Sequence, residues 1–93
     1  MYKIAVMGDY DSIYGFAAVG LDTYPLSDEK EAEKRLHQLV LSQYAVIYIT
    51  EEWAAKIPQA IDKYKDQILP AIIQIPGVSG NTGKGVENVK KFV

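Results

Sequence analysis

The chain has 93 residues, of which 48% are hydrophobic and 11% aromatic, enough apolar material for one ordinary hydrophobic core. Ten basic against twelve acidic residues give a formal net charge of -2, so the basic face of a nucleic-acid-binding protein is not expected. The sequence has no cysteine, which excludes disulfides and thiolate sites, and its single histidine excludes any site that needs two. No apolar run approaches the roughly 18 residues of a membrane span. We therefore expect a soluble, intracellular chain without direct membrane contact.

Short apolar segments predict the β-strands. Three of them are continuous runs rich in Ile and Val, which is typical of strands covered on both faces of a parallel sheet. A weaker strand is expected at 19–23, interrupted by Gly20 and stopped by Pro25; its broken pattern favours an edge position. The three stronger segments are residues 4–7, 45–49 and 71–75.

Between the strands the apolar period becomes helical. Residues 28–43 carry one apolar face, with Ser27 or Asp28 as the N-cap. A second periodic stretch contains Pro58, and the residue before a proline avoids the helical region. We expect a short turn there at 51–56, followed by a helix over 57–66. Two further helices are predicted at 12–18 and 84–93.

The alternation of strands and helices predicts an α/β fold. Such a chain forms right-handed crossovers and a parallel sheet with helices on its faces. We expect a four-stranded, mainly parallel sheet in three layers, Rossmann-like or receiver-like, with a mobile C-terminal helix. Residues 1–76 are predicted to form the compact domain, 77–85 a glycine-rich hinge, and 86–93 the start of a helix that continues beyond the last residue given.

The glycine-rich segment 77–85 lies between a strand and a helix, as a phosphate-binding loop does. A Walker A loop needs a glycine four residues before its Gly-Lys pair and a hydroxyl directly after it. Counting back from Gly83 and Lys84 places Val78 at the glycine position, and Gly85 has no hydroxyl. A flavin phosphate loop would follow the first strand rather than the last. We therefore predict a hinge and no bound cofactor.

Two carboxylates, Asp9 and Asp11, follow the first strand and could bind magnesium as in a phosphoacceptor receiver domain. A receiver also needs an aspartate after its central strand, where this chain has Thr50 followed by Glu51. The preferred interpretation is a turn in which Asp11 or Ser12 caps a helix. A degenerate receiver-like signalling domain is retained as the alternative.

No catalytic or metal-binding set is predicted from the remaining polar residues. Thr50 is expected to cap the next helix through its hydroxyl, with Glu51 and Glu52 facing the positive helix end. His37 lies beside the apolar stripe of its helix, which favours a solvated or half-buried side chain over a catalytic one.

Aromatic residues are the best candidates for partner contacts. Seven tyrosines and one tryptophan exceed what so small a core can hide, and both residue types are enriched at interfaces. The alternative, that these tyrosines merely straddle core and water, remains open. The last segment places four apolar side chains, Val86, Val89, Phe92 and Val93, on one side of a short helix that must pack on the sheet or on another chain. The candidate partner-binding residues are Tyr10, Tyr14, Trp53, Val86, Val89 and Phe92.

Several segments together resemble a known family. Residues 3–12, followed by Gly15-Phe16 and Gly20, resemble the opening of the F subunit of V-type and archaeal-type ATP synthases. Residues 47–51 and 70–76 resemble its second and third signatures, and a glycine-rich loop leading to a terminal helix completes the pattern. The resemblance covers essentially the whole chain in order.

This resemblance implies a rotor component rather than a catalyst. The F subunit of that family attaches to the coiled-coil D subunit in the central stalk, which turns inside a ring of A and B subunits and is linked to the membrane rotor. ATP chemistry takes place at the A/B interfaces, and no cofactor is implied for the F subunit. The location implied is cytoplasmic, peripheral to the membrane. The family's terminal helix is associated with regulating hydrolysis, and it corresponds here to Val86, Val89 and Phe92.

Overall fold

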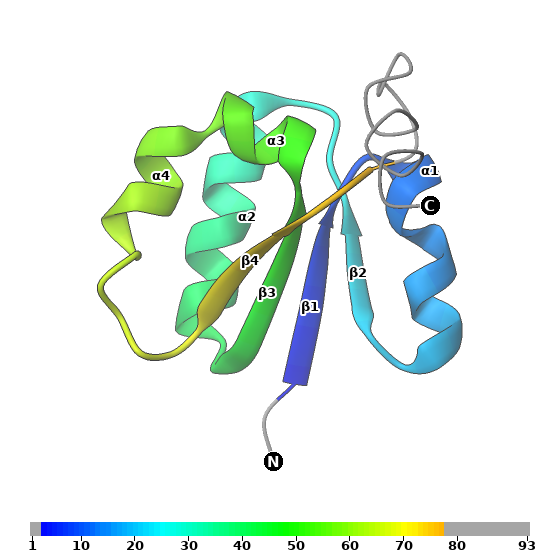
Figure 1. The fold of residues 1–93 in the computed structure, drawn as a ribbon, viewed down its shortest axis with the longest axis horizontal. Helices are drawn as coiled ribbons and strands as arrows, with labels where there is room; N and C mark the ends of the chain where they lie inside the picture. The colour runs from blue at the N-terminus through cyan, green and yellow to red at the C-terminus, as the bar shows by residue number, and fades with distance from the viewer. Residues whose placement is uncertain (1–2, 78–93) are drawn as a thin grey trace, which may run out of the picture.

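The computed structural model describes residues 3–77, which form a four-stranded sheet in the order β2-β1-β3-β4 (Figure 1). All neighbouring strands are parallel. The α/β fold with helices around a parallel sheet is therefore confirmed. The strands are β1 (Lys3–Gly8), β2 (Asp22–Pro25), β3 (Tyr44–Thr50) and β4 (Ala71–Ile75).

The helices alternate with the strands along the chain. The longest, α2, follows β2, and Asp28 is its N-cap, as one of the two predicted options had it. The helix expected at 12–18 is instead split into a short α-helix and a 3-10 helix. The bounds are α1 (Tyr10–Ile13), the 3-10 helix η1 (Tyr14–Val19), α2 (Glu29–Leu41), α3 (Glu51–Lys56) and α4 (Pro58–Lys63).

The second strand lies at the sheet edge as predicted, but its bounds differ from residues 19–23. Val19 belongs to η1, and Gly20 ends that helix with a left-handed φ of 92°. A strand can therefore begin only after this turn, and β2 runs from Asp22 to Pro25. Proline is accepted there because an edge strand has a free side that needs no ladder donor.

The segment after β3 contains more helix than the sequence predicts. Residues 51–56, expected as a turn, form the helix α3, and the helix expected over 57–66 is shortened to α4. The break between them lies at Ile57, whose φ of -129° and ψ of 50° are not helical. Pro58 is the cause, since it disfavours the helical region for the residue before it.

The helices divide between the two faces of the sheet. The connection from β1 to β2 crosses the sheet in one direction, and the later connections cross in the other, so right-handed crossovers place them on opposite faces. Helices α2, α3 and α4 enclose the main core, while α1 and η1 contact mainly β1 and β2. The main core includes Met7, Leu36, Ile47, Ile49 and Ile57.

None of the helices within residues 3–77 is long and apolar enough to cross a membrane. The predicted hinge, apart from Gly77, and the predicted terminal helix lie outside the described residues.

Candidate partner-binding surface

The first helix is held by a side-chain cap at the carboxyl end of β1. The Asp9 carboxylate accepts hydrogen bonds from Ser12 N at 3.2 Å and from Ser12 Oγ at 2.8 and 2.9 Å. The N-cap is therefore Asp9, and the expectation that Asp11 or Ser12 caps this helix is wrong. The reason is that the helix begins earlier than expected, because Asp9 has the extended backbone of an N-cap and its side chain reaches the amide three residues on. Ile13, fully buried, fixes the other side of α1 against the sheet.

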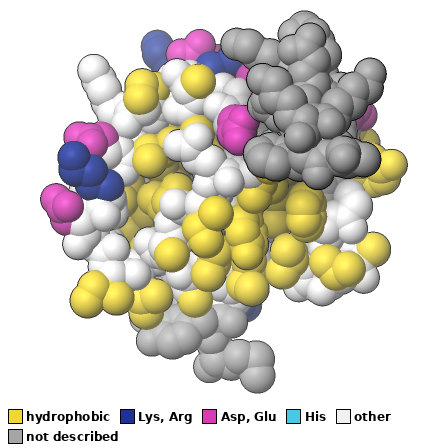
Figure 2. Space-filling model, viewed as in Figure 1, with side chains coloured by type: hydrophobic (Ala, Val, Ile, Leu, Met, Phe, Trp, Pro, Cys, Tyr) yellow, Lys and Arg dark blue, Asp and Glu magenta, His cyan; other side chains and the backbone are white. Residues whose placement is uncertain are grey.

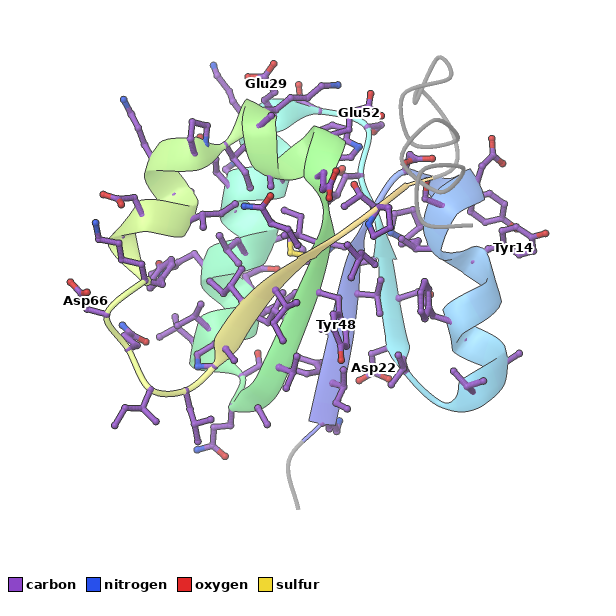
Figure 3. The ribbon with its side chains drawn as sticks, in the orientation of Figure 1. Tyr14, Asp22, Glu29, Tyr48, Glu52 and Asp66 are labelled. Atoms are coloured by element: carbon purple, nitrogen blue, oxygen red, sulfur yellow. The ribbon has the colours of Figure 1, made fainter. Side chains whose placement is uncertain are left out.

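This cap turns two tyrosines outward. Tyr10 and Tyr14, one helical turn apart, are 63% and 61% exposed. Their rings stack with centroids 5.5 Å apart and planes 14° from parallel. Figure 3 shows Tyr14 pointing away from the sheet. The structure thus brings together two of the six predicted partner-binding residues as one preorganised aromatic pair, which ordinary helix spacing allows.

Trp53 lies in the main core. It is 5% exposed, and it comes from α3, which covers the opposite face of the sheet from α1. Lys56 Nζ lies 4.4 Å from the centre of the indole ring, so the lysine also covers it. A partner could reach this side chain only if α3 moved, and its role in binding stays a prediction. Val86, Val89 and Phe92 lie outside the described residues.

The expectation that the Thr50 hydroxyl caps the next helix is wrong. Thr50 is the N-cap residue of α3 by position, but its side chain makes no capping hydrogen bond. Its Oγ1 is buried and has no hydrogen-bond partner among the described residues. A Cβ added to Gly8 would lie 2.5 Å from Thr50 Cγ2, and one added to Gly77 would lie 2.9 Å from Ser12 Oγ. Gly8 therefore lets β1 approach Thr50 of β3 closely, and Gly77 lets the chain after β4 approach Ser12 of α1.

His37 is exposed on α2, as expected, and its Nδ1 is hydrogen-bonded to the Tyr64 hydroxyl beyond α4. This contact ties two helices of the same layer together. Within residues 3–77, no group of three or more acidic or histidine side chains is placed to hold a metal ion.

The sequence did not predict a hydroxyl cluster at the other end of the sheet. The Tyr44 hydroxyl donates to Asp22 Oδ2 at 2.7 Å and is also hydrogen-bonded to the Tyr24 hydroxyl. Burial, followed by the hydrogen bonds to Tyr24 and Asp22, raises the pKa of Tyr44 above its ordinary value, so the hydroxyl stays a proton donor. Arg35 of α2 lies 5.1 Å from the Tyr24 ring centre. The cluster holds edge strand β2 to β3 and α2.

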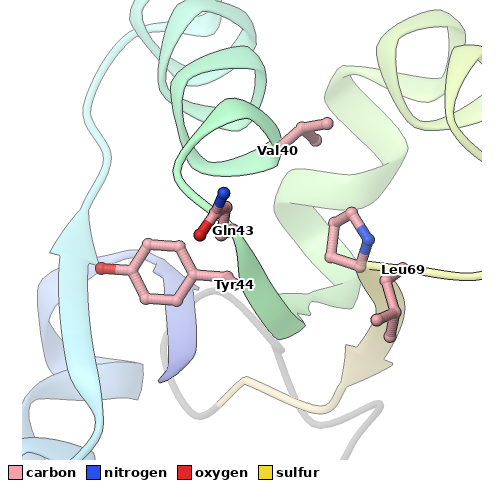
Figure 4. Close-up of a pocket in the computed structure, with 5 residues that line it drawn as sticks. Val40, Gln43, Tyr44 and Leu69 are labelled. Carbon is pink, nitrogen blue, oxygen red and sulfur yellow. The ribbon is translucent and has the colours of Figure 1, made fainter. Parts of the chain in front are cut away.

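Tyr44 reaches this cluster because the pairing of β1 with β3 shifts by one residue at its start, which turns Tyr44 toward the main core. Tyr44 also lines an open groove of about 310 Å³ with Val40, Gln43, Leu69 and Pro70 (Figure 4). The groove is open to solvent, and the Tyr44 hydroxyl is already hydrogen-bonded to Asp22 and Tyr24. A one-residue shift in strand pairing leaves no signal in the sequence.

Residues 3–77 thus define a small Rossmann-like α/β domain in which Tyr10 of α1 stacks on Tyr14 of η1. The profile of the family described as "ATP synthase (F/14-kDa) subunit" matches residues 4–93. The F subunit of the V-type ATP synthase of Clostridium perfringens is 44% identical over 98 aligned positions, which cover 100% of this chain and 93% of that protein. The corresponding protein of Fusobacterium nucleatum is 40% identical over 93 residues, covering 100% of this chain and 89% of that protein.

A more distant relative extends the similarity to archaea. The F subunit of the A-type ATP synthase of Methanosphaera stadtmanae is 36% identical over 80 residues, which cover 84% of this chain and 76% of that protein. The chain therefore belongs to the F-subunit family of V-type and A-type ATP synthases. The family resemblance drawn from the sequence segments is confirmed.

Proposed function

We propose that this chain is a non-catalytic central-stalk component of a V/A-type rotary ATP synthase, bound to the coiled-coil D subunit. The observation that carries the proposal is the family match, which spans residues 4–93. In this role the chain couples rotation between the A/B ring and the membrane rotor, and it meets the membrane only through the assembly. The location that follows is cytoplasmic and peripheral.

The Tyr10–Tyr14 pair supports a binding role for the surface formed by α1 and η1. Two stacked rings that are more than half exposed offer apolar area that is already ordered, so little side-chain entropy is lost on binding. Tyrosine is also among the residues that dominate binding energy at interfaces. We assign this pair to the contact with the D subunit, together with Val86, Val89 and Phe92 of the terminal segment.

The carboxylate that a receiver domain would need for magnesium has a structural task here. Asp9 accepts three hydrogen bonds from Ser12 and holds α1 in place. This arrangement favours the stalk proposal over the receiver-like alternative. Titration with Mg²⁺, followed by NMR of the Asp9 and Asp11 amides, distinguishes them, since a receiver-like site would shift both signals saturably.

The proposal is tested by co-expression with the cognate D subunit and size-exclusion chromatography. The unaltered chain is expected to elute as a one-to-one complex. The double variant Tyr10→Ser/Tyr14→Ser is expected to bind the D subunit about tenfold or more weakly, as loss of an interface anchor does. Its unfolding transition should stay close to that of the parent, because both side chains are largely exposed.

Leu41→Ser is the matched control, since Leu41 is 69% exposed but lies at the end of α2. It should bind the D subunit like the parent chain. Failure of the unaltered chain to form any complex with the D subunit would refute the stalk proposal itself. Equal binding by the tyrosine variant would refute only the assignment of Tyr10 and Tyr14.

A further inference from the structure

On one face of the sheet, the half formed by β3 and β4 has apolar side chains, and no helix within residues 3–77 packs over it. Tyr48 pairs with Val6 and with Ile73, and residues in register on parallel strands point to the same face. Val6 is covered by α1 and η1, which contact mainly β1 and β2 and leave β3 and β4 open on this side. We call this surface the open sheet face. Its members are Val46, Tyr48, Ala71, Ile73 and Ile75.

The open sheet face is partly exposed and contains no charged residue. Ile73 is 43% exposed, and its four companions are half-buried. Figure 2 shows hydrophobic side chains across the viewed face, with charged side chains toward its margins. A contiguous patch of this kind typically marks an interaction site.

The apolar residues of β4 indicate that another element packs on the open sheet face. Its residues Ile73 and Ile75 point to the open side, while the opposite face receives Ile72 and the polar Gln74. Parallel strands are ordinarily packed on both faces, and the usual cover is an α-helix. Helices α2, α3 and α4 provide it on the other face.

The edge of the sheet above this face is acidic. Parallel topology brings the first turns of α1, α2 and α3 to the carboxyl ends of the strands, and carboxylates are favoured in each first turn. Lys30 and Lys56 offset only part of this charge, and the Glu52–Lys56 pair is 3.9 Å long and exposed. The carboxylates are Asp11, Glu29, Glu31, Glu51 and Glu52.

We infer that the open sheet face is a docking surface for an α-helix of the stalk partner, one with an apolar stripe and with basic residues where it passes the carboxyl edge. The apolar stripe covers Tyr48 and Ile73, and the basic residues meet the acidic edge. The inference draws on two properties of the described residues, the apolar open sheet face and the acidic edge above it. Helices α1 and η1, which carry Tyr10 and Tyr14, lie on the same side of the sheet. The inference rests on the proposed function only in assigning that helix to the D subunit.

Because the chain has no cysteine, single-cysteine variants can probe this face cleanly. Ile73→Cys places a thiol on the open sheet face, and Gln74→Cys places one on the opposite face of the same strand. The measurement is the maleimide labelling rate of each full-length variant, alone and with an excess of the cognate D subunit. We expect that partner to slow labelling at position 73 about tenfold or more and at position 74 less than about twofold, since a docked helix excludes water from its contact.

A second pair of variants tests binding itself. Ile73→Asp introduces a charge into the apolar face and is expected to weaken the complex about tenfold or more, while Gln74→Asp is expected to bind like the parent. The double variant Asp11→Asn/Glu51→Gln should slow association several-fold at low salt and leave dissociation nearly unchanged. Circular dichroism melting of each variant confirms that it is folded.

Several results would overturn the inference while leaving the stalk proposal intact. One is a complex with the D subunit in which labelling at position 73 is not slowed. Another is that the free chain self-associates, and that Ile73→Asp makes it monomeric without changing its binding to the D subunit. The occupant of the open sheet face is then a second copy of this chain. A third combines three observations: Ile73→Cys is labelled slowly in the free chain, Ile73→Asp is cleaved faster by protease within residues 78–93, and Ile73→Asp binds the D subunit normally. The occupant of the open sheet face is then this chain's own last segment. If the unaltered chain forms no complex, the stalk proposal itself fails.

Discussion

At the scale of single residues, the carboxyl edge of the sheet depends on the absence of a side chain at Gly8. A Cβ there would lie 2.5 Å from Thr50 Cγ2 and 3.1 Å from Ile13 Cγ2. Thr50 and Ile13 are fully buried, so neither can move aside. We therefore expect Gly8→Ala to lower the free energy of unfolding by roughly 1–3 kcal/mol, the usual cost of overpacking. Urea denaturation followed by circular dichroism measures it.

The control for this prediction is Gly15→Ala in η1, where an added Cβ meets nothing within 4 Å. This variant should be unchanged or more stable by up to about 1 kcal/mol, because alanine restricts the unfolded chain. Equal destabilisation by both substitutions would contradict the close-packing argument.

Thr50 leads to a prediction of the opposite sign. Its buried Oγ1 has no hydrogen-bond partner among the described residues, and an unsatisfied buried polar group costs about 1–3 kcal/mol. Thr50→Val keeps the shape and removes the hydroxyl, so we expect the free energy of unfolding to rise by about 1 kcal/mol. Thr50→Ala, which also removes the methyl group, should lower it. A loss of stability in Thr50→Val would show that the hydroxyl has a partner in the folded chain.

At the scale of elements, the sequence specifies the start of α2 through its N-cap residue, Asp28. Asp28 Oδ2 accepts a hydrogen bond from Glu31 N at 3.0 Å, and Ala32, Leu36 and Leu39 bury one face. Loss of such a cap typically costs about 1 kcal/mol, so Asp28→Ala should lower the free energy of unfolding by about that amount.

Asp66→Ala serves as the matched control, since Asp66 is exposed in the turn after α4. Thermal melting of both variants by circular dichroism should place only Asp28→Ala below the parent chain. If the two variants melted alike, the general loss of a negative charge, not the cap, would be responsible.

At the scale of the whole molecule, the single tryptophan reports on the main core. Trp53 is buried among side chains from the sheet and from α2, α3 and α4. We expect blue-shifted native fluorescence and a urea transition that coincides with the one seen by far-ultraviolet circular dichroism, because sheet and helices share one core. An earlier fluorescence transition would show that α3 opens separately from the sheet.

The sequence by itself determined the elements whose signal is local. Continuous apolar runs marked β1, β3 and β4, because both faces of a parallel sheet need apolar side chains. The stripe of Ala32, Leu36 and Leu39 marked α2, and Pro58 marked the break between α3 and α4. Ordered segments along the whole chain were also enough to identify the family.

Only the tertiary structure decided how these elements meet. Trp53 turns inward because α3 packs on the sheet, and the Thr50 side chain is buried against Gly8 and makes no capping hydrogen bond. The Tyr44 cluster arises from a one-residue shift between paired strands, and the open sheet face arises from crossover direction. Each outcome joins residues far apart in the sequence, where spacing and periodicity carry no information; contact, strand register and handedness decide such features.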